Sequence, residues 1–343
     1  MNRKEIKNFT LKELEEEIKN LSKQPYRAGQ VFSWLYQKGA SDFSQLTDIP
    51  QELREKLNDS YFISRLELAE RLEAKDKTQK FLFKLADGNF IETVLIPSGQ
   101  RKTICLSTQV GCKYRCSFCA SGLNGFKRNL APAEMTGQIL YLLHTDKQNL
   151  TNFVFMGMGE PLDNFENLSR TILIMNSPEG LGIAARRITV STGGVIPGIE
   201  RLRNLGLQVN LSLSLHAVND SLRNKLMPIN KKYPLRKLIR VCQNYVESTG
   251  RMVTLEYVLI QDVNDSLGDA AKLAEIARRL RAKVNLIPYS PVCGLDFKTP
   301  QKKGIDGFQK ELERNKARVT LRRSKGEDIR AACGQLAGRA KQE

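Results

Sequence analysis

This chain of 343 residues contains little histidine, few aromatic residues and no long apolar run. Its two histidines, His144 and His216, are too few for a zinc site built from several imidazoles. Aromatic residues make up 7% of the chain, which argues against a nucleic-acid platform built mainly on base stacking. No apolar stretch approaches the ~18 residues of a membrane helix, and the N-terminal segment is charged and amphipathic, unlike a signal peptide. We therefore expect a cytosolic protein that does not enter a membrane.

Positive charge is in clear excess. Lysine and arginine total 54 against 37 aspartates and glutamates, which gives a formal net charge of +17. The basic residues are spread along the chain, and a surface of this kind attracts polyanions. Charge that serves solubility alone is the plainer interpretation. The excess nevertheless favours nucleic acid, and RNA above all, as a partner.

A helical accessory domain is expected over residues 1–75. Apolar periodicity predicts helices over 11–21 and 28–36, and the segment "IPQELREKL" predicts a third helix with Pro50 in its first position. We expect this domain to bind RNA.

Alternating strand and helix patterns follow the accessory domain. Residues 76–97 alternate and break at Asp87-Gly88, which predicts a β-hairpin extension. From 98 to 330, repeated βα patterns predict a parallel sheet covered by helices. The expected strands are 152–157, 187–192, 208–214, 253–260, 283–288 and 317–323, and the expected helices lie near 133–146, 164–176, 234–248, 268–281 and 305–315. Ligands of such folds bind at the carboxyl ends of the strands. Here those ends carry "GMGEP", "STGG", "SLH" and "PYSP".

Three of the seven cysteines, Cys112, Cys116 and Cys119, lie in one loop, "GCKYRCSFC". In a reducing compartment, a cluster of thiols indicates metal binding or catalysis rather than disulfides. A structural zinc site would need a fourth ligand, such as Cys105 or a distant thiol. A cubane iron–sulfur cluster can instead bind three of its irons to these thiolates and leave the fourth iron open. The C-x3-C-x2-C spacing favours the cluster.

The loop resembles the cluster loop of the radical S-adenosylmethionine superfamily, in which the amino and carboxylate groups of the cofactor complete the coordination of the fourth iron. Longer segments extend the resemblance to adenosine-C2 RNA methyltransferases of the RlmN type, from about Pro25 to Gly338. These segments are "CLSTQVGCKYRCSFCASGLNGFKRNL", "MGMGEPLDNF", "RRITVSTGGVIPGI", "SLSLHAVND", "PINKKYPL" and "GEDIRAACGQLAG".

The resemblance implies an α/β fold, a partial (β/α) barrel with a small N-terminal helical domain. It implies a 4Fe-4S cluster and S-adenosylmethionine as cofactors. The implied substrate is an adenine in 23S rRNA, at the peptidyl transferase centre, with an adenosine in the tRNA anticodon arm as a second one. A flavodoxin or ferredoxin would donate the electron, and we expect the chain to be a monomer.

The resemblance gives two further cysteines separate tasks. Adenine C2 has no lone pair that could attack a sulfonium methyl group, so a carbon radical is required. By analogy, Cys333, in a C-terminal segment over 331–343, takes a methyl group as a thiolate and carries it to the base as a radical. Cys105 then attacks Cys333, which releases methylated RNA and leaves a disulfide. Without the resemblance, Cys105 would be a core residue; Cys242 should be one, and Cys293 has no assigned role.

Glu92 is the acid–base candidate. It shares one face of a strand with Phe90, Val94 and Ile96, so its carboxylate should lose solvation and accept a proton more readily. A strand-end salt bridge would explain the residue equally well. The family position assigns Glu92 the general-base role, which is removal of the C2 proton.

Cofactor contacts are carried over by motif. The residues are Gly159 and Glu160 toward the amino group, Ser191, Ser214, Leu215 and His216 around the ribose and methionine portions, and Ser290. Taken singly, the glycine could serve a turn and the histidine could be structural. Ser290 stands where the family usually has asparagine, and Cys293 where it usually has proline. The shorter serine puts the direct contact in doubt, although a water could span the gap.

Two alternatives differ from the C2 interpretation. One is a C8-specific rRNA adenine methyltransferase of the resistance type, against which the N-terminal domain and the "GFKRNL" context argue. The other is a thiolate-metal RNA-binding protein that acts in ribosome assembly without chemistry.

Overall fold

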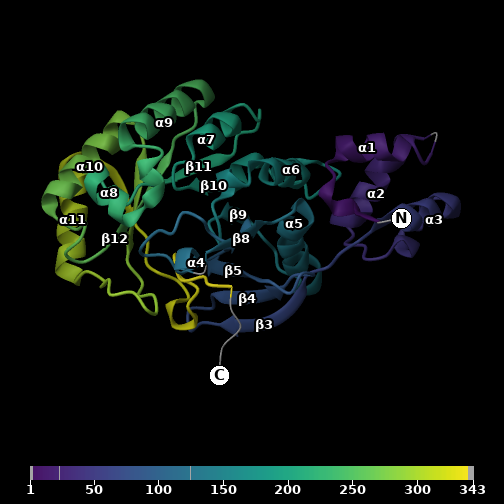
Figure 1. Ribbon diagram of the computed structural model, residues 1–343, viewed down its shortest axis with the longest axis horizontal. Helices are drawn as coiled ribbons and strands as arrows, with labels where there is room; N and C mark the ends of the chain where they lie inside the picture. Colours follow the sequence, from purple (N-terminus) through teal and green to yellow (C-terminus); the bar gives the residue numbers. More distant parts are fainter. Residues whose placement is uncertain (1–2, 23, 124, 339–343) are drawn as a thin grey trace.

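The computed structural model describes residues 3–22, 24–123 and 125–338, which form a ten-stranded sheet with helices outside it (Figure 1). The strand order in this sheet is β14-β13-β12-β11-β10-β9-β6-β5-β4-β3. The run from β6 to β14 is parallel, and β3, β4 and β5 extend it in antiparallel fashion. The strands are β3 (Glu67–Glu73), β4 (Gln79–Lys84), β5 (Phe90–Ser98), β6 (Arg101–Cys105), β9 (Asn152–Phe155), β10 (Ile188–Thr192), β11 (Asn210–Ser214), β12 (Thr254–Leu259), β13 (Lys283–Pro288) and β14 (Arg318–Leu321). The predicted α/β barrel is confirmed.

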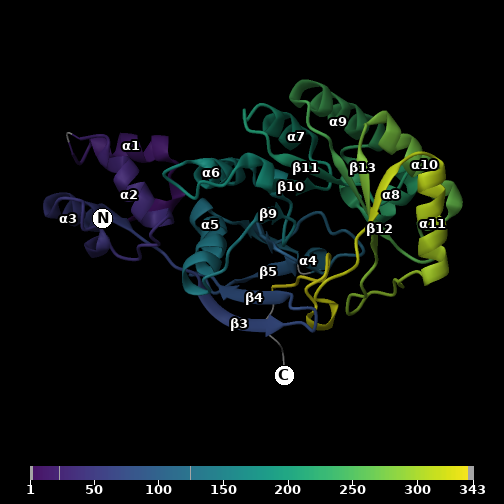
Figure 2. The ribbon, with the colours of Figure 1, turned by 180° about the vertical axis from the view of Figure 1, so that it is seen from behind.

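Helices cover the outer face of the parallel strands (Figures 1 and 2). They are α5 (Pro132–Leu140), continued by the π-helix η3 (Tyr141–Thr145), α6 (Phe165–Asn176), α7 (Ile196–Arg203), α8 (Asp220–Leu226), α9 (Leu235–Thr249), α10 (Leu267–Arg279) and α11 (Lys302–Arg314). The expected strands and helices are all present with small shifts of their ends, whereas β3, α7 and α8 were not expected. The strand β3 lies within the range 1–75 predicted to be helical but belongs to the main sheet, so the helical domain ends before it. Within the described ranges, no helix combines the length and the apolar character that crossing a membrane requires.

The helix α9 shows how local sequence sets these elements. Its apolar residues recur at helical spacing and are buried against the sheet, including Leu235, Leu238 and the predicted core residue Cys242. The helix ends at Gly250, whose φ of 65° is a left-handed conformation that favours glycine.

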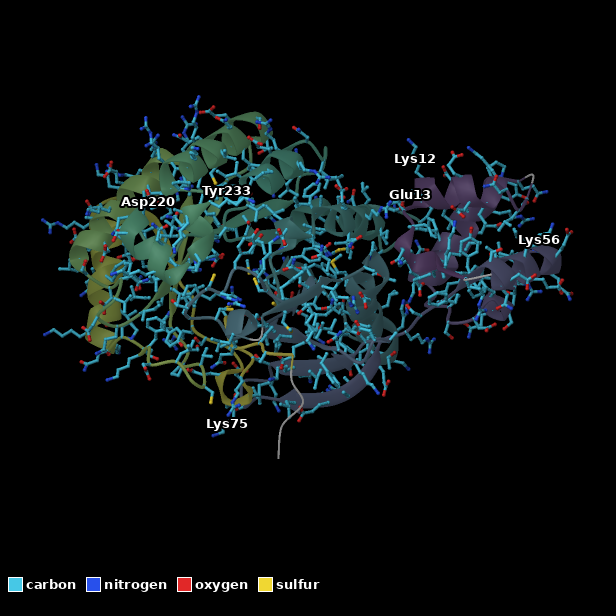
Figure 3. All side chains as sticks on the ribbon, viewed as in Figure 1. Lys12, Glu13, Lys56, Lys75, Asp220 and Tyr233 are labelled. Atoms are coloured by element: carbon cyan, nitrogen blue, oxygen red, sulfur yellow. The ribbon has the colours of Figure 1, made fainter. Side chains whose placement is uncertain are left out.

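The N-terminal elements form their own apolar cluster beside the barrel (Figure 1). They are β1 (Lys4–Glu5), α1 (Leu11–Lys19), α2 (Arg27–Tyr36), α3 (Gln51–Ser60) and β2 (Tyr61–Phe62). Pro50 caps α3 from outside rather than occupying its first position, which corrects the prediction by one residue. Contacts with the barrel include Ile174 of α6, which joins the N-terminal cluster, and Arg170, which pairs with Glu13 at 2.6 Å (Figure 3).

The antiparallel extension receives the C-terminal segment. The predicted hairpin is confirmed, since β4 and β5 pair around a turn that contains Gly88 at a φ of 78°. At the far end of β4, the backbone N–H of Lys75 donates to Asp328 at 3.1 Å, and that of Gly326 donates to Asp76 at 3.2 Å (Figure 3). The turn before β4 and the segment after β14, which are distant in sequence, therefore lie side by side. Residues 339–343 of the predicted C-terminal segment lie outside the described part.

The buried Arg223 of α8 holds the loops at the strand ends. Its guanidinium donates to the carbonyl oxygens of Leu215 at 3.0 Å, Gly193 at 2.7 Å and Ser214 at 3.0 Å, and to the side chain of Asn230 at 2.9 Å. One side chain thus connects the loops after β10 and β11, from which site residues project.

We predict that Ile174→Ala loosens the N-terminal domain. Ile174 is fully buried in the N-terminal cluster, so its truncation should lower the free energy of unfolding by roughly 2–4 kcal/mol in urea titration and speed proteolysis of residues 1–75. Leu173, its neighbour in α6, is 41% exposed and provides the control. Equal effects of Ile174→Ala and Leu173→Ala would contradict the proposed packing.

We predict that Arg223→Met destabilises the barrel. The substitution leaves buried acceptors without their donor, at a cost of about 3 kcal/mol or more. Thermal unfolding should show a clear fall in Tm. Lys225→Met on the same helix removes an exposed cation and should leave Tm nearly unchanged. A similar Tm for both variants would count against the structural role of Arg223.

Candidate active site

The cysteine loop is shaped by a small antiparallel hairpin of β7 (Gln109–Gly111) and β8 (Phe126–Asn129) and by the short helix α4 (Ala120–Leu123). Gly111, at a φ of 75°, allows the close approach, because a Cβ there would lie 1.7 Å from the carbonyl oxygen of Gly125. Sequence analysis did not predict this hairpin.

The three loop thiols line a single cavity of about 160 Å³ at the carboxyl ends of the strands. Burial raises the pKa of Cys112 to about 12, and burial with repulsion from Cys119 and Cys112 raises the pKa of Cys116. As thiolates, they therefore need neighbouring cations. Within the described residues, no three His, Cys, Asp or Glu side chains are grouped so that they could hold one metal ion. Three thiols that line one cavity provide the three thiolates that a cubane cluster binds, each through a separate iron.

Gly159 and Glu160 follow β9 and line the same cavity. Gly159 has a φ of 96°, and a Cβ there would lie 2.5 Å from Gln109. Burial raises the pKa of Glu160 to about 7, while the N–H groups of Gly193 and Leu162 donate to its carboxylate at 2.7 and 3.1 Å. An acid fixed by two backbone donors at this position can receive a cationic amino group.

The remaining predicted cofactor contacts differ in whether they line the cavity. Ser191, Ser214 and His216 line the cavity, whereas Leu215 and Ser290 are not among its lining residues. Leu215 is fully buried. Ser290 is hydrogen-bonded to Ser324, with 2.7 Å between the hydroxyl oxygens.

His216 is neutral and has a defined orientation. The N–H of Val258 donates to its Nδ1 at 3.0 Å, which leaves the ring hydrogen on Nε2, and Phe118 packs edge-on against the ring. Burial lowers the pKa of His216 to about 3. The ring can therefore act as a hydrogen-bond donor and an apolar wall, and not as a cation.

Cys333 lines the same cavity as the loop thiols and is exposed. Its segment is fixed to the first two residues of α4, because the N–H of Ala120 donates to Gly334 at 2.7 Å and the hydroxyl of Ser121 donates to Leu336 at 2.7 Å. The C-terminal cysteine is thus placed against the loop, more than 200 residues away in sequence.

Cys105 ends β6 and is buried close to Cys333. Burial, and then the charge of a Cys333 thiolate, raise the pKa of Cys105 to about 12, and Arg322 opposes the shift. The thiol of Cys333 is likewise the main cause that raises the pKa of Arg322. Cys105, Cys333 and Arg322 thus form one electrostatic group.

Glu92 is buried but does not line the cavity. Its Oε2 accepts from the N–H groups of Ala337 at 2.6 Å and Gly338 at 2.9 Å, and its Oε1 pairs with Lys80 at 2.9 Å. The carboxylate therefore anchors the segment that carries Cys333.

Three further residues were not singled out from the sequence: Arg223, Arg322 and Glu256. Glu256 is a lone acid in the apolar run "TLEYVLI", a signal that could have been noticed. It also lines a second cavity of about 830 Å³ inside the barrel, which is lined by cationic side chains. These are Arg101, Arg186, Arg251, Lys283, Arg322, Arg323 and Lys325.

Comparisons with known proteins agree with this geometry. Residues 106–274 match the model of the Radical SAM superfamily, and residues 4–63 match that of the ribosomal RNA large subunit methyltransferase N-terminal domain. The chain is 44% identical to a probable dual-specificity RNA methyltransferase RlmN of Caldicellulosiruptor saccharolyticus, over 97% of both chains. It is 43% identical to the dual-specificity RNA methyltransferase RlmN of Syntrophus aciditrophicus, over 100% of this chain and 99% of the relative.

A solved structure gives the same result. A radical SAM methyltransferase from Sphaerobacter thermophilus superposes with a TM-score of 0.92 at 43% identity, over 98% of this chain and 100% of the other. The cofactors of this enzyme class are a 4Fe-4S cluster and S-adenosylmethionine, which the cavity fits. The chain therefore belongs to the RlmN family of radical S-adenosylmethionine RNA methyltransferases.

Proposed function

We propose that this enzyme methylates C2 of an adenosine in 23S rRNA and of an adenosine in the tRNA anticodon arm, through a methyl group carried on Cys333. The observation that carries the proposal is that Cys333 shares one cavity with Cys112, Cys116 and Cys119, although it comes from the far end of the chain. The relatives named dual-specificity RNA methyltransferases support two classes of RNA.

In this proposal, Cys112, Cys116 and Cys119 ligate the cluster, which supplies the electron that cleaves S-adenosylmethionine to a carbon radical. Gly159 and Glu160 hold the amino group of the cofactor. The remaining contacts would come from Ser191, Ser214, Leu215, His216 and Ser290. Because Ser290 is bonded to Ser324, its contact would pass through water.

Cys333 first attacks, as a thiolate, the sulfonium methyl group of one S-adenosylmethionine, which leaves as S-adenosylhomocysteine. Arg322 lies close enough to stabilise the charge of the thiolate. The carbon radical from a second S-adenosylmethionine would take one hydrogen atom from the methyl group and become deoxyadenosine, and the methylene carbon left on Cys333 then bonds to C2 of adenine.

The adduct then loses the C2 proton, which Glu92 accepts, and one electron, which the oxidised cluster would take back. Attack by the Cys105 thiolate on the Cys333 sulfur breaks the bond between that sulfur and the methylene carbon, which takes up a proton and becomes the product methyl group. Glu92 can reach the base only if its carboxylate exchanges its hydrogen bonds with Ala337 and Gly338. We propose that the C-terminal segment moves at this stage.

The reaction also needs an electron donor, for which we propose a flavodoxin or ferredoxin. Exposed cations surround the cysteine loop, namely Lys113, Arg115 and Lys127, and they would attract an acidic carrier. We propose a monomer that works in the cytoplasm, where both RNA substrates occur, with residues 1–75 as an RNA-binding domain, 76–97 as a hairpin extension and 98–330 as the catalytic core.

The two-thiol route predicts different failures of Cys333→Ala and Cys105→Ala. Cys333→Ala should place no methyl group on protein or RNA, because the carrier is gone. Cys105→Ala should trap RNA covalently on Cys333, visible as a slow, nuclease-sensitive band in a denaturing gel after anaerobic turnover.

Nucleoside mass spectrometry of the RNA released by wild type, against 2-methyl and 8-methyl adenosine standards, tests the regiochemistry on rRNA and tRNA. Exclusive 8-methyl product would refute C2 specificity. Free methylated RNA from Cys105→Ala would mean that another thiol, such as Cys293, resolves the adduct.

Glu92→Gln distinguishes a general-base role of Glu92 from a role in holding the C-terminal segment. If Glu92 removes the C2 proton, Cys333 methylation, which needs no RNA, should proceed in this variant, while the RNA adduct accumulates and product falls at least about 100-fold. Peptide mass spectrometry and the denaturing gel measure the two steps. The exposed Glu67→Gln is the matched control. Loss of Cys333 methylation without an adduct would instead assign Glu92 an anchoring role alone.

A further inference from the structure

One carboxylate oxygen in the centre of the barrel lacks a partner. Glu256 is 4% exposed, and its Oε1 accepts from Ser212 and Asn285, both at 3.1 Å. Its Oε2 is buried and has no hydrogen-bond partner among the described residues. An unpaired buried acceptor costs free energy, and a site that retains one commonly meets a donor on its ligand.

Glu256 stands where the two cavities meet. Among the described residues, Met156, Glu256 and Arg322 are the ones that line both the cavity of the cysteines and the cation-lined cavity inside the barrel. The first cavity contains Cys333, and the second suits a polyanion. A nucleotide that enters through the second cavity and presents its base to Cys333 must pass Glu256 and Arg322.

Arg322 supplies the complementary donor. It attracts both Glu256 and Cys333, yet no ion pair between Arg322 and Glu256 is formed within the described part of the chain. The cavity of the cysteines therefore contains a donor, Arg322, whose charge acts on both the acceptor Glu256 and Cys333.

We propose that Oε2 of Glu256 accepts a hydrogen bond from the exocyclic amino group of the target adenine, while Arg322 donates to ring nitrogen N1. This inference rests on the proposed function, and it assigns Glu256 the selection of the base. On adenine, C2, N1 and the C6 amino group follow one another along one edge. The three residues complement that edge: Cys333 would supply the carbon for C2, Arg322 a donor for N1 and Glu256 an acceptor for the amino group. Arg322, which interacts with both of the others, suits the middle position.

The amino group that donates to Glu256 could also belong to S-adenosylmethionine, which contains adenine. The structure favours the RNA base, because Glu256 lines the cation-lined cavity as well as the cavity of the cysteines. A phosphate is a poor ligand for Oε2 itself, because two anions repel each other.

The test compares two synthetic RNA hairpins of the substrate sequence, which carry adenosine or purine ribonucleoside at the methylated position. Purine lacks the amino group and keeps N1. Affinity is measured without reductant on the reconstituted enzyme, and single-turnover methylation is measured separately. Wild type should prefer adenosine by roughly 10- to 100-fold in both readouts.

Glu256→Gln provides the decisive variant. Ser212 and Asn285 donate to the Oε1 position, so they should hold the amide oxygen there and place the amide NH₂ at the position of Oε2. This NH₂ opposes the amino group of adenine, and the preference should disappear or invert. Affinity for S-adenosylmethionine should stay unchanged. The exposed Glu275→Gln removes the same charge from α10 and should retain the preference.

The outcomes distinguish a failure of the Glu256 assignment from a failure of the proposed methylation through Cys333. Equal affinity of wild type for both hairpins, or an unchanged preference in Glu256→Gln, would overturn the assignment. So would a loss of S-adenosylmethionine affinity alone, which would place the cofactor's adenine at Glu256. If Glu256→Gln does not fold, equal affinity of wild type for the two hairpins would still overturn the assignment. Failure of the proposed function would appear elsewhere, as absence of methyl on Cys333 in wild type.

Discussion

The hydrogen bonds between the C-terminal segment and the cysteine loop are the contacts on which the active site depends. Ala120 follows Cys119 directly and donates to Gly334, the residue after Cys333. Because backbone groups make this contact, it holds the two sulfur-bearing segments in fixed register without using either thiol. Glu92 secures the same segment from the antiparallel extension, through two backbone N–H groups. Without these bonds, Cys333, the proposed methyl carrier, would lie on an untethered segment, and its proximity to the cysteine loop would be lost.

Polar residues of the barrel line two adjoining cavities. The cavity of the cysteines also contains Glu160 and the neutral His216, and this lining suits a bound cofactor. The cation-lined cavity adjoins it, and Glu256 lines both. Buried charges in such a place cost stability, and Arg223 shows how the fold compensates, because its guanidinium is hydrogen-bonded to strand-end carbonyls.

Much of this could be predicted from the sequence, because regular strands and helices follow from periodic apolar patterns. The alternation after residue 98 indicated the parallel sheet, and the spacing of Cys112, Cys116 and Cys119 indicated the cluster. The short helix α8 was missed because its seven residues carry a weak periodic signal, and with it Arg223 was missed. Glu256 could not be assigned, because its significance lies in an unpaired oxygen, which depends on three strands packed together. The contact between Gly334 and Ala120 could not be predicted either, because it joins backbone groups of two segments that are distant in sequence.

The central claim is that the methyl group passes through Cys333 as a carbon radical and not directly to the base. Turnover with S-adenosylmethionine whose methyl group carries three deuteriums tests this most directly. The proposed route removes one deuterium at Cys333 and later adds one solvent proton, so the RNA methyl group should contain two deuteriums, and the deoxyadenosine formed should contain one. An RNA methyl group that retains all three deuteriums would contradict the route and favour direct transfer.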